Sequence, residues 1–207
     1  HLDVVKYLVE KCALADEFRP HKALEGAAKE GHLDVVKYLV EKCALADEFR
    51  PHKALEGAAK EGHLDVVKYL VEKCALADEF GLHWVLYSAA NEGHLDVVKY
   101  LVEKCGQVDE WGKTALHMAA SAGHVDILQY LVENGAEVNA VNWGGKTALH
   151  LATERGRVDV VKSLVESGAQ LDAKDKVGQV PFDLAKDETI VNYLNGQHAK
   201  LLDAKNK

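Results

Sequence analysis

Residues 1–31 read HLDVVKYLVEKCALADEFRPHKALEGAAKEG, and the same letters recur without a change at 32–62. The segment begins a third time at His63 and holds through Phe80. Its framework then persists with changed letters, as HLDVVKYLVEKC at 94–105, HVDILQYLVENG at 124–135 and RVDVVKSLVESG at 157–168. A fixed period near thirty residues indicates one supersecondary unit that stacks on copies of itself.

The first half of each unit, read at Asp34 to Cys43, predicts a broad helix. Its apolar residues fall at i, i+3, i+4 and i+7, the spacing of one helical face: Val36, Leu39, Val40 and Cys43. The opposite face is charged: Asp34, Lys37, Glu41 and Lys42. Val35 and Tyr38 widen the apolar arc, so we expect this helix to have neighbours on two sides.

The segment from Pro20 to Glu30 predicts a second, thinner helix. Proline is pre-organised for a first helical position, and a glycine such as Gly31 ends a helix as a left-handed cap. The expected inner face consists of Leu24, Ala27 and Ala28. A narrow row of such helices stacked beside a broad row should bend the array, with the concave side along the thin helices.

Three later stretches carry a more specific motif: GKTALHMAA at 112–120, GKTALHLA at 145–152 and VPFDLA at 180–185. They resemble the T-P-L-H-x-A signature of ankyrin repeats. The same resemblance extends to Gly123-His124, Gly135-Ala136 and Val138-Asn139-Ala140, and it covers residues 1–195. It implies an all-α ankyrin-repeat solenoid of stacked helix-turn-helix units with short β-turn or hairpin loops.

The identical units depart from that pattern, because Lys22-Ala-Leu-Glu25 replaces the signature and the period is shorter than the family's. Their loop fingers should therefore be short or absent, and the best-formed finger should lie between His124 and Gly156. We divide the chain into a single array: a half repeat at 1–18, full repeats at about 19–49, 50–80, 81–110, 111–141 and 142–174, and a C-terminal capping repeat at 175–207. The last helix is expected to be a shortened one at Asp187–Asn195, with Ile190, Val191 and Leu194 inward and a polar tail that caps or frays.

Composition limits the class of protein. The chain has 207 residues, of which 28% are charged and 48% apolar, as in ordinary globular proteins. No apolar run approaches the roughly 20 residues of a membrane span, and a net charge of −8 argues against nucleic acid as a partner. The cysteines recur once per unit, at Cys12, Cys43, Cys74 and Cys105. Packed helices lie about 8–10 Å apart, too far for a disulfide, so we expect reduced, buried thiols and a cytoplasmic location.

The sequence opens at His1 in the middle of a unit and without an initiator methionine, which predicts a fragment of a longer array. The first broad helix lacks a thin helix before it. We therefore expect its exposed apolar edge to pack on upstream chain or on a neighbour. The identical repeats leave three origins open: recent tandem duplication, deliberate engineering, or an artificial placeholder sequence.

Several apparent chemical motifs fail on spacing. Gly-Lys-Thr at 112–114 and 145–147 resembles the end of a phosphate-binding loop, but the first glycine of that motif would fall at Gln107 or Ala140. A ladder of histidines stands at the starts of the broad helices, where all but the first directly follow a capping glycine: His1, His32, His63, His94 and His124. Its rungs lie too far apart for zinc, so we expect each imidazole to bond the last free carbonyls of a thin helix. We predict no catalytic residue, no cofactor and no metal, and hence no enzyme.

The resemblance implies that contacts come from the loop tips and the exposed positions of the thin helices. The predicted partner-binding residues are Arg19, His21, Arg50, His52, His83, Asn91, Trp111, Lys113, Ser121, Trp143, Lys146 and Arg155. Trp111 and Trp143 lie at loop tips among polar residues, and tryptophan is enriched where binding energy concentrates. The alternative for each indole is that it folds back on its neighbour as structural cover.

Two further features stand on the thin helices. His21, His52 and His83 form a row at their mouths, either solvated or in a pH-dependent contact. Trp84 and Tyr87 occupy the Thr and His positions of the signature and are expected to reshape the local stacking or the concave floor.

The leading hypothesis is an intracellular, non-catalytic module that binds another protein through its concave face and loop tips. One alternative is a structural or engineered scaffold that serves as a spacer and has no natural ligand. The other is the regulatory arm of a larger enzyme or channel.

Overall fold

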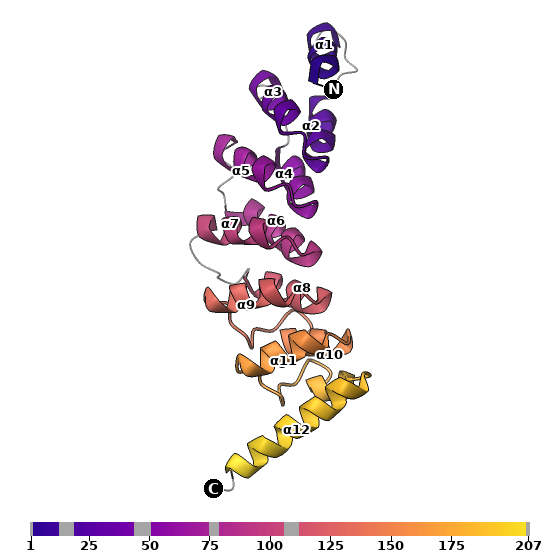
Figure 1. The fold of residues 1–207 in the computed structure, drawn as a ribbon, viewed down its shortest axis with the longest axis vertical. Helices are drawn as coiled ribbons and strands as arrows, with labels where there is room; N and C mark the ends of the chain where they lie inside the picture. The colour runs from indigo at the N-terminus through magenta and orange to yellow at the C-terminus, as the bar shows by residue number, and fades with distance from the viewer. Residues whose placement is uncertain (1, 13–18, 44–50, 75–78, 106–111, 206–207) are drawn as a thin grey trace. The chain divides into compact units, whose positions relative to one another are not determined.

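The computed structural model describes residues 2–12, 19–43, 51–74, 79–105 and 112–205. They belong to two compact units, His1–Cys105 and Gly106–Lys207. Every regular element within the described residues is a helix (Figure 1). The prediction of an all-α repeat fold is confirmed.

The first unit consists of two layers of helices. One layer holds the thin helices α2 (Pro20–Lys29), α4 (Pro51–Lys60) and α6 (Glu79–Glu92). The other holds the broad helices α1 (Leu2–Cys12), α3 (Leu33–Cys43), α5 (Leu64–Lys73) and α7 (Leu95–Cys105). Consecutive thin helices pack on one another, and each also packs on the broad helix that follows it (Figure 1).

The broad helices bury the face that their periodicity predicts. In α3, Val36 and Leu39 are fully buried and Val35 and Val40 nearly so, while Lys37 and Glu41 are exposed. The corresponding leucines of the next two repeats, Leu70 and Leu101, are also fully buried. Burial of each such side chain stabilises the fold by roughly 1.5–3 kcal/mol, so these leucines hold successive repeats of the first unit together.

The thin helices end as expected at a left-handed glycine. Pro20 is the first residue of α2, and Gly31 has a φ of 73°. The amide of His32 donates to Ala27 O at 2.8 Å, and that of Gly31 donates to Ala28 O at 3.2 Å. These two bonds form a Schellman motif, which satisfies the last carbonyls of the helix and turns the chain into α3.

Glycine also keeps the thin helices narrow where they meet. A Cβ placed on Gly57 of α4 would lie 3.7 Å from the Lys29 Cβ of α2. Ala27, Ala28, Ala58 and Ala59 fill the rest of the thin layer as buried residues. Small side chains thus allow a close approach of α2 and α4. The predicted curvature concerns the whole array and stays a prediction, as do the predicted repeat boundaries.

The second unit repeats the arrangement with two changes. Its thin elements are α8 (Gly112–Ala122), α10 (Ala148–Glu154) and the short 3-10 helix η1 (Pro181–Leu184). Its broad helices are α9 (Val125–Glu133), α11 (Val158–Glu166) and α12 (Glu188–Lys205). The first change is that the last thin element is a single 3-10 turn. The second is that long loops project between the helices.

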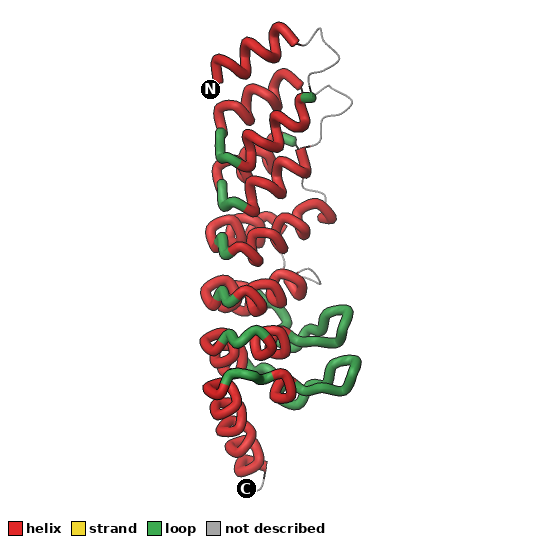
Figure 2. Tube along the Cα trace, turned by 90° about the vertical axis from the view of Figure 1, so that its right-hand side faces the viewer, coloured by secondary structure: helices red, strands yellow, loops and turns green. Residues whose placement is uncertain are grey.

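Two of these loops form fingers, at residues 134–147 and 167–180, and Figure 2 shows them lying side by side. The finger expected between His124 and Gly156 is therefore confirmed, and a second finger follows it. The expectation of short fingers in the identical units concerns residues 13–18, 44–50 and 75–78, which lie outside the described residues.

The final helix corrects a prediction. We expected a shortened helix at Asp187–Asn195, but α12 runs for 18 residues, from Glu188 to Lys205. Ile190 and Leu194 are buried as expected, and Val191 is half-buried. The tail holds good helix formers and no proline, and Gly196 costs a helix only about 1 kcal/mol relative to alanine. The helix therefore continues through the polar tail to Lys205.

The apolar edge predicted at the first helix is present. Val4 and Tyr7 of α1 are 60% and 61% exposed, whereas Val35, the equivalent of Val4 in α3, is 5% exposed. The difference arises because α1 has a neighbouring broad helix on one side and α3 has one on both.

Candidate functional site

The predicted partner-binding residues fall into three groups. Arg50 and Trp111 lie outside the described residues, and the side chain of Lys113 in α8 is likewise not described. In the first unit, Arg19 and His52 are exposed at the starts of α2 and α4, while His21, His83 and Asn91 are half-buried. In the second unit, Trp143 and Arg155 are exposed and Ser121 and Lys146 are half-buried. The structure thus distributes them along the thin helices and the first finger.

The base of the first finger is fixed by the Thr-Ala-Leu-His motif. Thr147 is the N-cap of α10, and its Oγ1 accepts from the amide of His150 at 3.4 Å. The His150 Nδ1 accepts from the amide of Thr147 at 3.2 Å and lies 2.8 Å from its Oγ1. This reciprocal pair is a capping box in which histidine takes the place of the usual glutamate.

The histidines of the two Thr-Ala-Leu-His motifs, His117 and His150, also bind each finger to the preceding thin helix. His150 Nε2 donates to Gln179 O at 3.1 Å, and His117 Nε2 donates to Lys146 O at 3.0 Å. Both acceptors stand at the end of a finger, just before the next thin element. His150 is completely buried, so its two ring nitrogens hold α10 and the second finger in a fixed relation.

Each finger is closed by a side-chain turn. Asn142 Oδ1 accepts from the amides of Gly144 and Lys146 at 2.9 and 3.0 Å. Asp175 Oδ1 accepts from those of Val177 and Gln179 at 3.0 and 2.9 Å. Asn and Asp favour such turns because their short side chains reach the backbone two residues on.

The two fingers are also bonded to each other. The amide of Lys176 donates to Gly144 O at 3.0 Å. Asn139 bridges their bases, since its Oδ1 accepts from the Gln170 amide at 2.8 Å and its Nδ2 donates to Gly168 O at 3.3 Å. Backbone amides that are paired in this way leave the tips rigid relative to one another.

The tips of this rigid pair are apolar. Trp143 is 96% exposed, and Val177 at the tip of the second finger is 77% exposed. The indole of Trp143 therefore does not fold back as cover for a neighbour. Below it, Lys146 Nζ and Glu154 Oε2 form an ion pair of 2.8 Å. The hydrogen bond from Lys146 and its positive charge hold the pKa of Glu154 below its ordinary value.

The histidine ladder has the predicted kind of hydrogen bond, with one difference. His63 Nε2 donates to Lys29 O, and His94 Nε2 donates to Lys60 O, each at 2.9 Å. Each acceptor belongs to the thin helix of the preceding repeat, so the bond joins two repeats. Arg157 takes this place in the second unit, where its Nε donates to Ser121 O at 3.1 Å.

The predicted ladder of buried thiols can be compared with the structure at one cysteine, Cys74. Cys74 is free and only half-buried, which corrects the expectation of full burial. It stands at the end of α5, beyond the last buried turn of that helix. Burial still raises the pKa of its thiol. The side chains of Cys12, Cys43 and Cys105 lie outside the described set.

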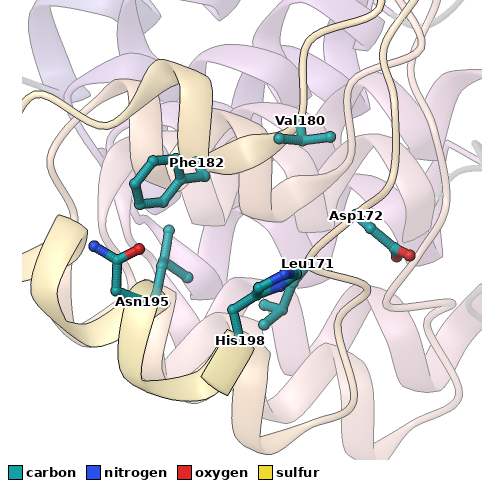
Figure 3. Close-up of a pocket in the computed structure, with 7 residues that line it drawn as sticks. Leu171, Asp172, Val180, Phe182, Asn195 and His198 are labelled. Carbon is teal, nitrogen blue, oxygen red and sulfur yellow. The ribbon is translucent and has the colours of Figure 1, made fainter. Parts of the chain in front are cut away.

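Two features were absent from the predicted site. Trp84 of α6 is 59% exposed, and its ring lies parallel to that of Tyr87. A signal for this pair is nevertheless present in the sequence, because Trp84 and Tyr87 stand in the positions of the Thr and His of the motif. The other feature is a cavity of about 340 Å³ between the base of the second finger, η1 and α12 (Figure 3). Its lining residues are Leu171, Asp172, Val180, Phe182, Leu194, Asn195 and His198.

The comparison with known families agrees with the geometry. The family model described as ankyrin repeats (3 copies) matches residues 1–80, 44–109 and 86–175. The chain therefore belongs to the ankyrin-repeat family, whose members are generally protein–protein interaction modules. No curated protein matches the chain.

In the described residues no three His, Cys, Asp or Glu side chains gather closely enough to hold a metal ion. None of the helices found there combines the length and the apolar character that crossing a membrane requires.

Proposed function

We propose that this protein is a non-catalytic module that binds a partner protein through the exposed faces of its thin helices and the tips of its two fingers. The observation that carries the proposal is Trp143, a nearly fully exposed indole on a loop whose backbone is held on both sides. Large exposed aromatic side chains on rigid supports are where protein interfaces concentrate their binding energy.

Rigidity matters because binding otherwise costs the entropy of ordering a loop. The turn at Asn142, the bond from Lys176 to Gly144 and the ring of His117 fix the first finger in the free protein. Val177 extends the apolar tip onto the second finger, and Lys146 and Arg155 supply polar groups nearer to α10. An apolar centre with a polar rim is the usual composition of a protein interface.

The test begins with the identification of partners that the immobilised protein retains, followed by affinity measurements on the purified pair. Trp143→Ala should weaken binding at least tenfold, which corresponds to about 1.4 kcal/mol. The matched control is Glu137→Ala, which removes an exposed side chain from the same finger without touching its hydrogen bonds. It should leave the affinity within twofold.

An unchanged affinity of the Trp143→Ala variant, with an intact circular-dichroism spectrum, would remove Trp143 as the anchor. A further variant that lacks residues 19–80 distinguishes a module from a spacer. Full retention of every partner by this shortened chain would assign the identical repeats a spacer role.

A further inference from the structure

Helix α6 differs from its two preceding equivalents at three positions where α2 and α4 carry charged residues. Lys22 of α2 and Lys53 of α4 correspond to Trp84, and Glu25 and Glu56 correspond to Tyr87. Lys29 and Lys60 correspond to Asn91. At these three positions the opposite charges of α2 and α4 are replaced by two aromatic rings and an amide on α6, while Glu92 keeps the acidic residue of Glu30 and Glu61.

The aromatic pair on α6 is a fixed platform. The ring centroids of Trp84 and Tyr87 lie 4.9 Å apart, and the ring planes differ by 7°. The residues are separated by three positions, so they stand on adjacent turns of one helix face. One side of the indole thereby meets Tyr87, while 59% of the Trp84 surface stays open to solvent. An indole held in one orientation can bind a flat or ring-shaped group at little entropic cost.

The platform lies in line with two lysines. Lys22, Lys53 and Trp84 recur at the same place in the repeat, on α2, α4 and α6, and all three are exposed. These helices pack consecutively, so the three side chains stand about 8–10 Å apart from one rung to the next. Neither lysine forms an ion pair with another residue in the described part of the chain. Two free cations and one aromatic face therefore form a row of even spacing.

A polyproline-II segment has a matching period. It makes one turn in three residues and rises about 3.1 Å per residue, so every third side chain points the same way about 9.3 Å farther on. A β-strand, by contrast, points successive residues to opposite faces and cannot keep a spacing of three on one side. Proline-containing segments in this conformation characteristically dock on aromatic surfaces.

We propose that the row Lys22, Lys53 and Trp84 binds a partner segment in polyproline-II conformation, with a carboxylate on each lysine and a proline ring on Trp84. The partner is thus an acidic, proline-rich peptide of the pattern E-x-x-E-x-x-P or its reverse. Uncharged prolines at the intervening positions suit the neighbouring Glu25 and Glu56, which would repel further acidic residues. The inference rests on the proposed function and names the partner chemistry of its first unit.

The test uses fluorescein-labelled peptides EPPEPPP and PPPEPPE and fluorescence anisotropy with the intact protein. At least one of them should bind with a dissociation constant below about 1 mM. The peptide EPPPEPPP, whose charges are four residues apart, and the charge-reversed KPPKPPP should bind at least fivefold more weakly. The affinity should fall as salt is raised, since both charged contacts are exposed.

Variants locate the site. Trp84→Ala and Lys53→Ala should each weaken the peptide at least fivefold. Their matched controls are Tyr7→Ala, which removes an exposed aromatic ring from the broad helix α1, and Lys73→Ala, which removes an exposed lysine from the broad helix α5. Both controls should bind as the unchanged protein does. All four substituted residues are exposed, and thermal melts should confirm that each variant folds.

The proposal is overturned if neither peptide binds, if EPPPEPPP binds equally well, or if Tyr7→Ala weakens the peptide as much as Trp84→Ala. These outcomes are separable from failure of the proposed function. A captured partner that is lost with Trp143→Ala but retained by Trp84→Ala refutes the row and leaves the function standing. If a peptide binds the row but captured proteins bind equally well after either tryptophan is replaced, the row stands and the proposed function is refuted.

Discussion

His150 is the residue through which the fold of the second unit can be tested most sharply. Its ring is fully buried, and it bonds the Thr147 amide through Nδ1 and Gln179 O through Nε2. His150→Ala leaves that amide and that carbonyl without these partners and opens a cavity the size of an imidazole. A buried polar group left unpaired costs about 1–3 kcal/mol, and the cavity adds to it. We expect a loss of about 3 kcal/mol in the free energy of unfolding.

Urea denaturation followed by circular dichroism measures that loss, and hydrogen exchange locates it. Because contacts in a repeat array run between neighbours, protection should fall in α10, η1 and the second finger, while the first unit keeps its protection. His52→Ala is the matched control, since His52 is exposed at the start of α4. It should change stability by less than about 0.5 kcal/mol. A His150→Ala variant as stable as this control would refute the role assigned to the buried histidine.

Three further predictions follow from other contacts. Lys146→Ala should raise the pKa of Glu154 toward its ordinary value, as an NMR titration of the Glu154 carboxyl carbon would show. Because folding lowers this pKa, the stabilisation by the Lys146–Glu154 pair is present above pH 4.5 and is lost as the pH falls through the folded pKa. It amounts to less than about 1 kcal/mol for so exposed a pair. A titration unmoved by the substitution would contradict the assigned cause. Gly62→Ala should destabilise the fold by more than about 1 kcal/mol, because φ of Gly62 is 79° and the new Cβ would meet His94 Nδ1. Gly26→Ala, with open space around the new Cβ, should instead stabilise α2 by up to about 1 kcal/mol. Equal melting temperatures of the two variants would count against both predictions. Iodoacetamide should label Cys74 more slowly in the folded protein than in urea at pH 8, because burial raises its pKa; mass spectrometry of its tryptic peptide measures the rate, and equal rates would show that the thiol is not shielded.

The sequence predicts the helices of this fold well because they arise from local patterns. Val36, Leu39 and Val40 share one face of a helix whatever lies beyond it, and Gly31 marks a helix end through its own backbone freedom. The Thr-Ala-Leu-His motif likewise announces the first finger, since Thr147 and His150 cap α10 within four residues. These features need no knowledge of distant contacts.

Features that depend on neighbouring repeats were harder to predict. His63 was expected to cap a thin helix, but only the stacked structure shows that its acceptor is Lys29 of the preceding repeat. The polar composition of the tail predicts a cap or a frayed end, and it does not reveal the full extent of α12, although nothing in the sequence stops a helix there. Nothing in the sequence pattern signals the cavity beside Phe182, which forms where a finger, a 3-10 turn and a helix meet.

The candidate site was predicted in part for the same reason. Trp143 could be placed at a loop tip from its register, but its exposure depends on bonds between two fingers. Trp84 is recognisable in the sequence as a departure from the motif. The sequence predicts that it reshapes either the local stacking or the concave floor, because sequence alone does not show which face of α6 stays open.

A hydrogen-exchange footprint of a bound partner tests the central claim most directly. Upon binding, we expect slower exchange in the fingers at 134–147 and 167–180 and along the thin helices α8 and α10, with little change in the broad helices α9 and α11. Protection confined to α9 and α11, with both fingers exchanging as in the free protein, would place the interface on the opposite layer and contradict the account.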